Sequence, residues 1–222
     1  MMSLFDNVVC QFRTDAIESV EHLKTDTLNT FVDLSNDCID LLGKLVHTCP
    51  HATLDNSLTW TDVTAVFKQL YAMNFDFLCG RYVEIERSLR FMWESIARAT
   101  YTDCFSQIEM NQNESPGESL DSKIEWLKRR EGKLNWNRVI RPTLVFAGYS
   151  PDEIEENLNP LWMSLHEAVH PSCSLREVEL LITNRHVAHL FNKDLALLVA
   201  NKARTVYSVV ERLVENQFPQ VR

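Results

Sequence analysis

The pattern His166-Glu167-Ala168-Val169-His170 is the first group of residues in this sequence that could carry out chemistry. Two histidines four residues apart share one face of a helix, where they can bind a zinc ion with the glutamate as general base. Pro171 follows at once and ends the helix, and nothing singles out a third ligand, although Glu177 and Glu179 are near. The alternative is a coincidental helix end, so we expect no metal and no cofactor.

A second group lies earlier in the chain and consists of charged residues spaced four apart and alternating in sign: Glu86, Arg90, Glu94 and Arg98. Residues four apart are neighbours on a helix, so this group can form a ladder of ion pairs. One interpretation is a solvated flank that supports a long helix. The other is that Arg87, Arg90 and Glu94 line a polar groove against another helix.

The third group is a basic segment. From Lys123 to Arg141, seven Lys and Arg stand against two Glu, a net charge of +5, whereas the whole chain carries −9 and the remainder therefore −14. Cations neutralise phosphates and an exposed tryptophan stacks on a base, so such a segment suits nucleic acid. The residues expected to contact it are Lys128, Arg129, Arg130, Lys133, Trp136, Arg138 and Arg141. The alternatives are a solvated helix whose tryptophans anchor it in the core, and a contact with the acidic segment 152–156.

Composition indicates an ordinary globular protein. The chain has 222 residues, of which 45% are hydrophobic and 24% charged. We expect one domain over residues 1–222. No stretch approaches 18 apolar residues, and the N-terminus lacks the pattern of a secretory signal, so we expect a cytoplasmic protein with no membrane contact. The six cysteines form no C-x-x-C pair, and we expect them to be reduced core residues.

The elements that must position these groups are helices. Apolar residues recur in steps of three and four from Thr59 to Phe105, which predicts one very long helix or two helices bent near Gly80, with Thr59 or Thr61 as the cap. Residues 3–49 are also predicted helical, with a break near 25–27. A polar loop is expected over His51 to Leu58.

The second half is predicted to contain shorter helices. A mobile loop is expected over 108–119, a basic helix over 120–131 and a broken helix over 132–149. Ser150 to Glu153 forms a capping box that opens a helix to about Val169. A second box, Ser174 to Glu177, opens the last helical region, which continues to about Asn216 with a bend near Asn192. The predicted fold is all-α, an antiparallel bundle of long helices.

Three phrases carry a resemblance to a known family: Arg87 to Glu94, Ala99 to Asp103, and Leu165 to Ser172 with its V-H-P-S segment. Together they resemble an uncharacterised prokaryotic all-helical family, which is distantly similar to the HEPN superfamily (higher eukaryotes and prokaryotes nucleotide-binding). The resemblance covers about residues 80–215. Members of that superfamily are helical bundles, often dimers, in toxin–antitoxin and antiviral systems, and many are metal-independent RNases.

The resemblance implies a site in which His170 and Ser172 face Arg87, Arg90 and Glu94. The histidine would act as general acid or base while the arginines hold a phosphate. The alternative is that His170 only ends its helix and hydrogen-bonds a neighbouring one. This chain departs from the family pattern, because no arginine is followed by a histidine at the spacing of the superfamily's nuclease motif.

Three functions follow as expectations. The first is an RNA-binding or RNase-like role in prokaryotic defence or toxin–antitoxin regulation. The second is a non-catalytic helical interaction or oligomerisation protein, and the third is a zinc-dependent hydrolase. The expected partners are RNA or another nucleic acid and a second copy or partner protein.

Overall fold

The computed structural model describes residue 17 and residues 26–78, 80–109, 115–130, 135–169 and 193–221. Every regular element in these ranges is helical, so the predicted all-α class is confirmed. None of the helices described is both long enough and apolar enough to cross a membrane. The second capping box, the bend near Asn192 and residues 110–114 of the expected loop lie outside these ranges.

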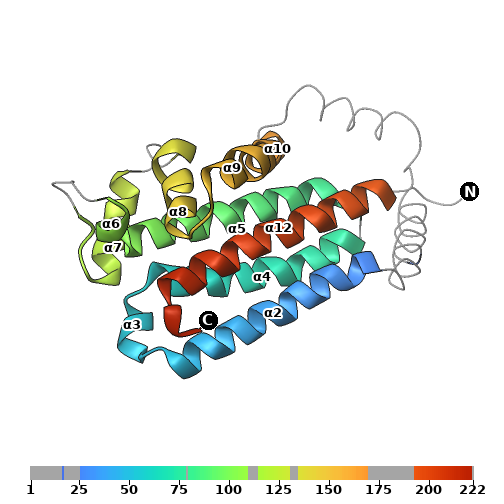
Figure 1. Cartoon of the computed structure of the whole chain (residues 1–222). Coiled ribbons are helices and arrows are strands. Elements are labelled where there is room, and N and C mark those ends of the chain that lie inside the picture. The colour runs from blue at the N-terminus through green and yellow to red at the C-terminus, as the bar shows by residue number, and fades with distance from the viewer. Residues whose placement is uncertain are drawn as a thin grey trace, which may run out of the picture.

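In the part of the chain that the structure describes, four long helices form the body (Figure 1): α2 (Asp26–Thr48), α4 (Leu58–Leu78), α5 (Tyr82–Asp103) and α12 (Lys193–Gln217). Helix α5 packs against α4 and α12, and α2 packs against the same two helices from the other side. Their apolar faces meet in one core, in which Trp93, Phe31 and Phe77 are among the largest fully buried side chains. This arrangement follows from the three-and-four spacing of the apolar residues.

The stretch from Thr59 to Phe105 is a helical hairpin. Helices α4 and α5 are joined at Gly80, whose φ of 64° lies in the left-handed region that favours glycine. Ser95 of α5 donates a hydrogen bond to Asp62 of α4 at 2.6 Å, so the two helices lie side by side in opposite directions. The predicted break near Gly80 is therefore confirmed and the single very long helix is wrong, but the chain reverses its direction at Gly80 rather than bending.

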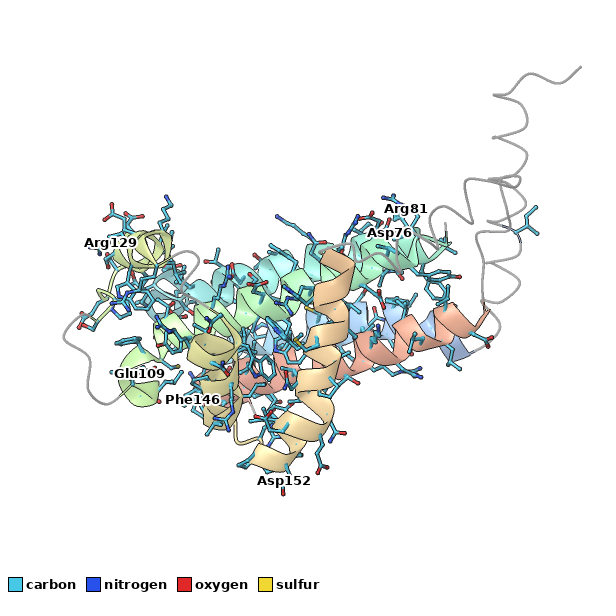
Figure 2. All side chains as sticks on the ribbon, turned by 90° about the horizontal axis from the view of Figure 1, so that it is seen from above. Asp76, Arg81, Glu109, Arg129, Phe146 and Asp152 are labelled. Atoms are coloured by element: carbon cyan, nitrogen blue, oxygen red, sulfur yellow. The ribbon has the colours of Figure 1, made fainter. Side chains whose placement is uncertain are left out.

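A second layer covers the outer side of α5 (Figures 1 and 2). Its elements are α6 (Phe105–Ile108), α7 (Leu120–Arg129), η1 (Trp136–Ile140), α8 (Arg141–Phe146), α9 (Pro151–Glu153), η2 (Ile154–Leu158) and α10 (Asn159–Val169). The predicted capping box starts α9, because Ser150 accepts from the Glu153 N–H at 3.2 Å and donates its own N–H to the Glu153 carboxylate at 2.8 Å. Viewed from above, α10 lies across α5 (Figure 2).

Helix α12 departs from the expected antiparallel arrangement. Lys202 forms an ion pair with Glu86 in the first halves of α12 and α5, and Gln217 donates to Asp103 at 2.8 Å where both helices end. The two helices therefore run in the same direction. The reason is visible in Figure 1, where the elements from α6 to α10 travel back along the bundle before α12 begins.

The region 51–58 also differs from expectation. It holds the short helix α3 (His51–Asp55), which buries Leu54 in the core. Pro50 precedes α3, a position that tolerates the missing N–H of proline. A single buried apolar residue in a polar stretch has no periodicity, so the sequence did not predict a helix here. The chain ends its described part in η3 (Pro219–Val221), which packs against α2.

The cysteines that the structure describes behave as predicted. Cys38, Cys49 and Cys104 are buried and form no disulfide. Burial, with help from the neighbouring Asp37, raises the pKa of the Cys38 thiol to about 12, so this group stays protonated and unreactive. Cys10, Cys79 and Cys173 lie outside the described residues.

Candidate functional site

Arg90 is the centre of the site predicted from the charged ladder, and it is buried. Its side chain lies under α10, with the guanidinium carbon 3.1 Å from the centre of the Trp162 ring. It donates to the Trp162 carbonyl at 3.0 Å and to the Glu94 carboxylate at 3.4 Å. Burial lowers the pKa of Arg90 to about 10, so it remains charged at neutral pH. Arg90 therefore faces another helix, as the groove interpretation predicts. That helix is α10, and it covers the Arg90 side chain, so no open groove remains at this residue.

The other members of the ladder form ion pairs both within α5 and with α12. Arg98 forms an ion pair with Glu94, and Glu86 pairs with Lys202 of α12 rather than with Arg90. Arg87 pairs with Glu84 at 2.7 Å and is partly exposed. The solvated-flank interpretation is therefore wrong for Glu86 and Arg90, because α12 and α10 pack against this face of α5.

Three tryptophans pack together where α10 crosses Arg90 of α5. Trp93 of α5 makes edge contacts with Trp136 and Trp162, at centroid distances of 6.4 and 5.3 Å, and the last two rings lie 5.4 Å apart. Trp136 was expected to stack on a base, but its ring packs against the core. The alternative of tryptophans as anchors is correct for it and for Trp126, which is buried. A tryptophan cannot stack on a base and fill the core at the same time.

The two remaining residues of that predicted site, His170 and Ser172, lie outside the described residues. Of the zinc pattern, only His166 has a described side chain, so neither the zinc interpretation nor the general acid–base role is tested. Within the ranges that the structure describes, no group of three His, Cys, Asp or Glu side chains is placed to hold a metal ion.

The cations of the basic segment divide into two sets. Arg130 stacks on Trp126 at 4.5 Å, and Arg141 donates to Glu155 at 3.0 Å, as the predicted contact with the acidic segment requires. Lys128, Arg129 and Arg138 are exposed and have no ion-pair partner among the described residues. Lys133 lies outside them. Three exposed cations therefore remain of the predicted nucleic-acid surface.

Asp103 forms a polar cluster that the sequence did not predict. It accepts hydrogen bonds from the Ser57 hydroxyl at 2.8 Å and the Thr59 N–H at 3.0 Å. It also accepts from Gln217 at 2.8 Å and from the Lys123 ammonium at 2.8 Å. Burial alone would raise the pKa of Asp103, but these hydrogen bonds outweigh it and hold the pKa below its ordinary value. One carboxylate thus joins α4, α5, α7 and α12.

The same contacts correct the predicted helix cap. Ser57 accepts from the Trp60 N–H at 3.1 Å, and Asp103 takes the Thr59 N–H, so neither Thr59 nor Thr61 caps α4. The one sequence feature that includes this aspartate is the segment Ala99 to Asp103 of the family resemblance, and the resemblance assigned no role to Asp103. A cavity of about 320 Å³ opens beside this cluster. Because every oxygen of Asp103 already accepts hydrogen bonds, the carboxylate is not poised as a base.

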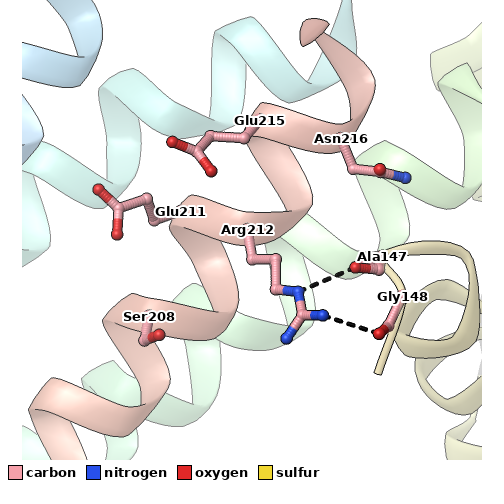
Figure 3. Close-up of a pocket in the computed structure, with 7 residues that line it drawn as sticks. All are labelled: Ala147, Gly148, Ser208, Glu211, Arg212, Glu215 and Asn216. Carbon is pink, nitrogen blue, oxygen red and sulfur yellow. Dashed lines mark hydrogen bonds between the residues drawn. The ribbon is translucent and has the colours of Figure 1, made fainter. Parts of the chain in front are cut away.

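A second polar cavity, of about 510 Å³, lies between α12 and the end of α8 (Figure 3). Arg212 donates to the carbonyls of Ala147 at 3.0 Å and Gly148 at 2.7 Å, and it stacks on Tyr149 at 4.0 Å. A cation at these free carbonyls is favoured by the helix dipole. Arg212 therefore fastens the C-terminal end of α8 to α12, and its donors are used by these carbonyls rather than kept for a ligand.

Among the described residues, α2 and α4 share an exposed apolar surface. On α2, Val32, Ile39 and Val46 are exposed and seven residues apart, so they form one stripe. On α4, Tyr71 and Phe75 are each 60% exposed and touch edge to face at 6.0 Å. The Asn74 amide donates a hydrogen bond to the Ser35 hydroxyl at 3.4 Å, so the exposed apolar residues of α2 and α4 lie on adjoining sides of the two helices. We call this surface the α2–α4 face.

The α2–α4 face continues into the core. Leu42 of α2 and Trp60, Phe67 and Leu78 of α4 are partly buried and line it. Soluble proteins rarely leave aromatic and branched side chains of neighbouring helices exposed together unless the surface binds something. Which face of a helix stays uncovered depends on tertiary packing, so the sequence did not predict this surface.

Comparison with known proteins finds no match for this chain among protein-family models, curated proteins or solved structures.

Proposed function

We propose that this chain is a non-catalytic helical interaction protein that binds a protein partner through the α2–α4 face. The observation that carries the proposal is the exposure of Ile39, Tyr71 and Phe75 on adjoining helices. Burying such side chains is worth about 1.5–3 kcal/mol each, which is the usual driving force of association.

The use of the charged residues supports this proposal over a catalytic one. Arg90 is held by α10, Glu94 is held by Arg98, and the Asp103 carboxylate is held by donors from Ser57 and from α4, α7 and α12. Catalytic groups need an unoccupied position for a substrate within hydrogen-bond reach. Arg90, Glu94 and Asp103 are therefore closed by the fold itself.

The proposal is tested by replacing Phe75 with a photo-crosslinking amino acid and irradiating the cells that produce the protein. Position 145 is the matched control, because Val145 is also an exposed apolar residue, 50% accessible, but lies on α8. We expect discrete adducts from position 75 and none from position 145. The absence of adducts at position 75, or equal adducts at both positions, would remove the proposal.

A second candidate function is RNA binding in a HEPN-like helical bundle with a role in prokaryotic defence or toxin–antitoxin regulation. The exposed cations Lys128, Arg129 and Arg138 favour it, because they have no partner among the described residues. Phosphate contacts weaken steeply with salt, so replacing all three by glutamine should abolish salt-dependent RNA binding. Equal binding by the variant and the wild type would exclude this surface.

A further inference from the structure

The α2–α4 face carries a charge pattern as well as an apolar stripe. Three aspartates, Asp33, Asp37 and Asp40, and one lysine, Lys44, are exposed along the edge of α2 that faces α12 rather than α4, so this edge is acidic on balance. On α4, Lys68 is exposed on the side away from α2. The apolar side chains lie between these two edges. Such a surface is complementary to a second copy of itself. When the second copy is rotated by 180° about an axis parallel to α2 and α4, its basic edge faces the acidic edge of the first copy.

The register of the two helices places the charges level with each other. Ser35 is level with Asn74, and α2 and α4 run in opposite directions. Asp40 is five residues after Ser35 on α2, and Lys68 is six residues before Asn74 on α4, so the two charges lie at nearly the same level along the helices. A two-fold axis parallel to the helices would therefore bring Asp40 of one copy to Lys68 of the other, and the reverse.

Gly43 provides a second observation next to Ile39, with which it lines a cavity of about 510 Å³ that extends to Glu211 of α12. It lies in the interior of α2, four residues after Ile39, and a side chain added there would meet nothing within 4 Å. Glycine inside a helix costs stability relative to alanine, and no contact within this chain requires it here. A glycine at this position allows a large side chain of another helix to approach closely.

We propose that a second copy of this chain occupies the α2–α4 face, with α2 of each copy packed against α4 of the other. This inference rests on the proposed function and names its partner. Direct packing of α2 on α2 is disfavoured, because each α2 has three exposed aspartates, Asp33, Asp37 and Asp40. The arrangement proposed instead sets the acidic edge of α2 against Lys68 and buries Ile39 near Tyr71 and Phe67 of the partner.

Sedimentation equilibrium of the purified full chain tests the inference. We expect a mass of twice 25.8 kDa for the wild type, and at least a tenfold weaker association for Ile39→Asp. Val145→Asp is the control, since it places the same charge at an equally exposed position on α8, and it should leave the association unchanged. Circular dichroism shows whether each variant is folded.

Charge reversal identifies the partner and its orientation. Asp40→Lys alone and Lys68→Glu alone should each weaken association several-fold, and the double variant should recover it, because the reversed charges again face each other across the two-fold axis. Failure of the double variant to recover would overturn this arrangement. A monomeric wild type that still forms adducts with other proteins at position 75 would overturn the second copy and leave the proposed function standing. A monomer without adducts would overturn both.

Discussion

Helix α5 and the α2–α4 face make opposite use of their side chains. Three residues of α5 have types that indicate chemistry. Arg90 and Asp103 are engaged by neighbouring helices, and Glu94 is engaged by Arg90 and Arg98 of α5 itself. The residues of the α2–α4 face, which look like ordinary core residues in the sequence, are exposed. The difference teaches that a charged pattern with helical spacing can serve to stabilise a helix and fasten it to its neighbours, whereas a group of apolar side chains exposed together on adjoining helices is what supports the proposed binding surface.

The largest effect on the α5 side is expected for Asp103→Ala. The change removes a carboxylate that fastens four helices and leaves Lys123 without its buried partner. We expect the free energy of unfolding to fall by about 3–5 kcal/mol, as for other broken buried ion pairs. Urea denaturation measures this, and a loss below about 1 kcal/mol would contradict the fastening role.

Arg90→Ala should have the next largest effect. It removes the stack on Trp162 and two hydrogen bonds, so we expect a loss of about 2–4 kcal/mol in urea denaturation. Arg90→Lys is the matched variant, because it keeps the charge and loses the planar stack. If lysine restored full stability, charge rather than stacking on Trp162 would be the source of the stabilisation.

How much of this could be read from the sequence depends on the range of the interactions. The all-α class, the break at Gly80 and the Ser150 cap rest on local patterns, and they were predicted. Asp103 meets Ser57 and Gln217 from distant parts of the chain, and the direction of α12 depends on the route between α5 and α12. Neither has a local signal, because spacing along one helix does not reveal which helix lies opposite.

Asp103→Asn should have a smaller effect that depends on pH. The pKa of Asp103 is held below its ordinary value in the folded chain, so its stabilisation is present above the unfolded pKa of about 3.9 and is lost as pH falls through the folded pKa. We expect Asn to cost about 1.5–3 kcal/mol at pH 7, and the difference from wild type to shrink on acidification. Unfolding curves at several pH values measure this. A difference that does not change with pH would contradict the ionised state of Asp103.

Gly43→Ala should have the smallest effect and the opposite sign. Because nothing lies within 4 Å of a Cβ at this position, alanine should stabilise α2 by about 0.5–1 kcal/mol. Thermal unfolding at low protein concentration measures the effect on the single chain. A loss of stability would mean that the chain itself requires the glycine, and the α2–α4 face would lose one of its supports.

The contrast between the two regions is tested most directly by combining them in one chain. Adduct formation from the crosslinking side chain at position 75 is measured in a chain that also carries Arg90→Lys. If α5 only holds the fold together, adducts form as in the wild-type background although the urea midpoint is lower. Loss of the adducts in a chain that circular dichroism shows to be folded would mean that Arg90 contributes to binding, and would contradict the separation of structure and function between α5 and the α2–α4 face.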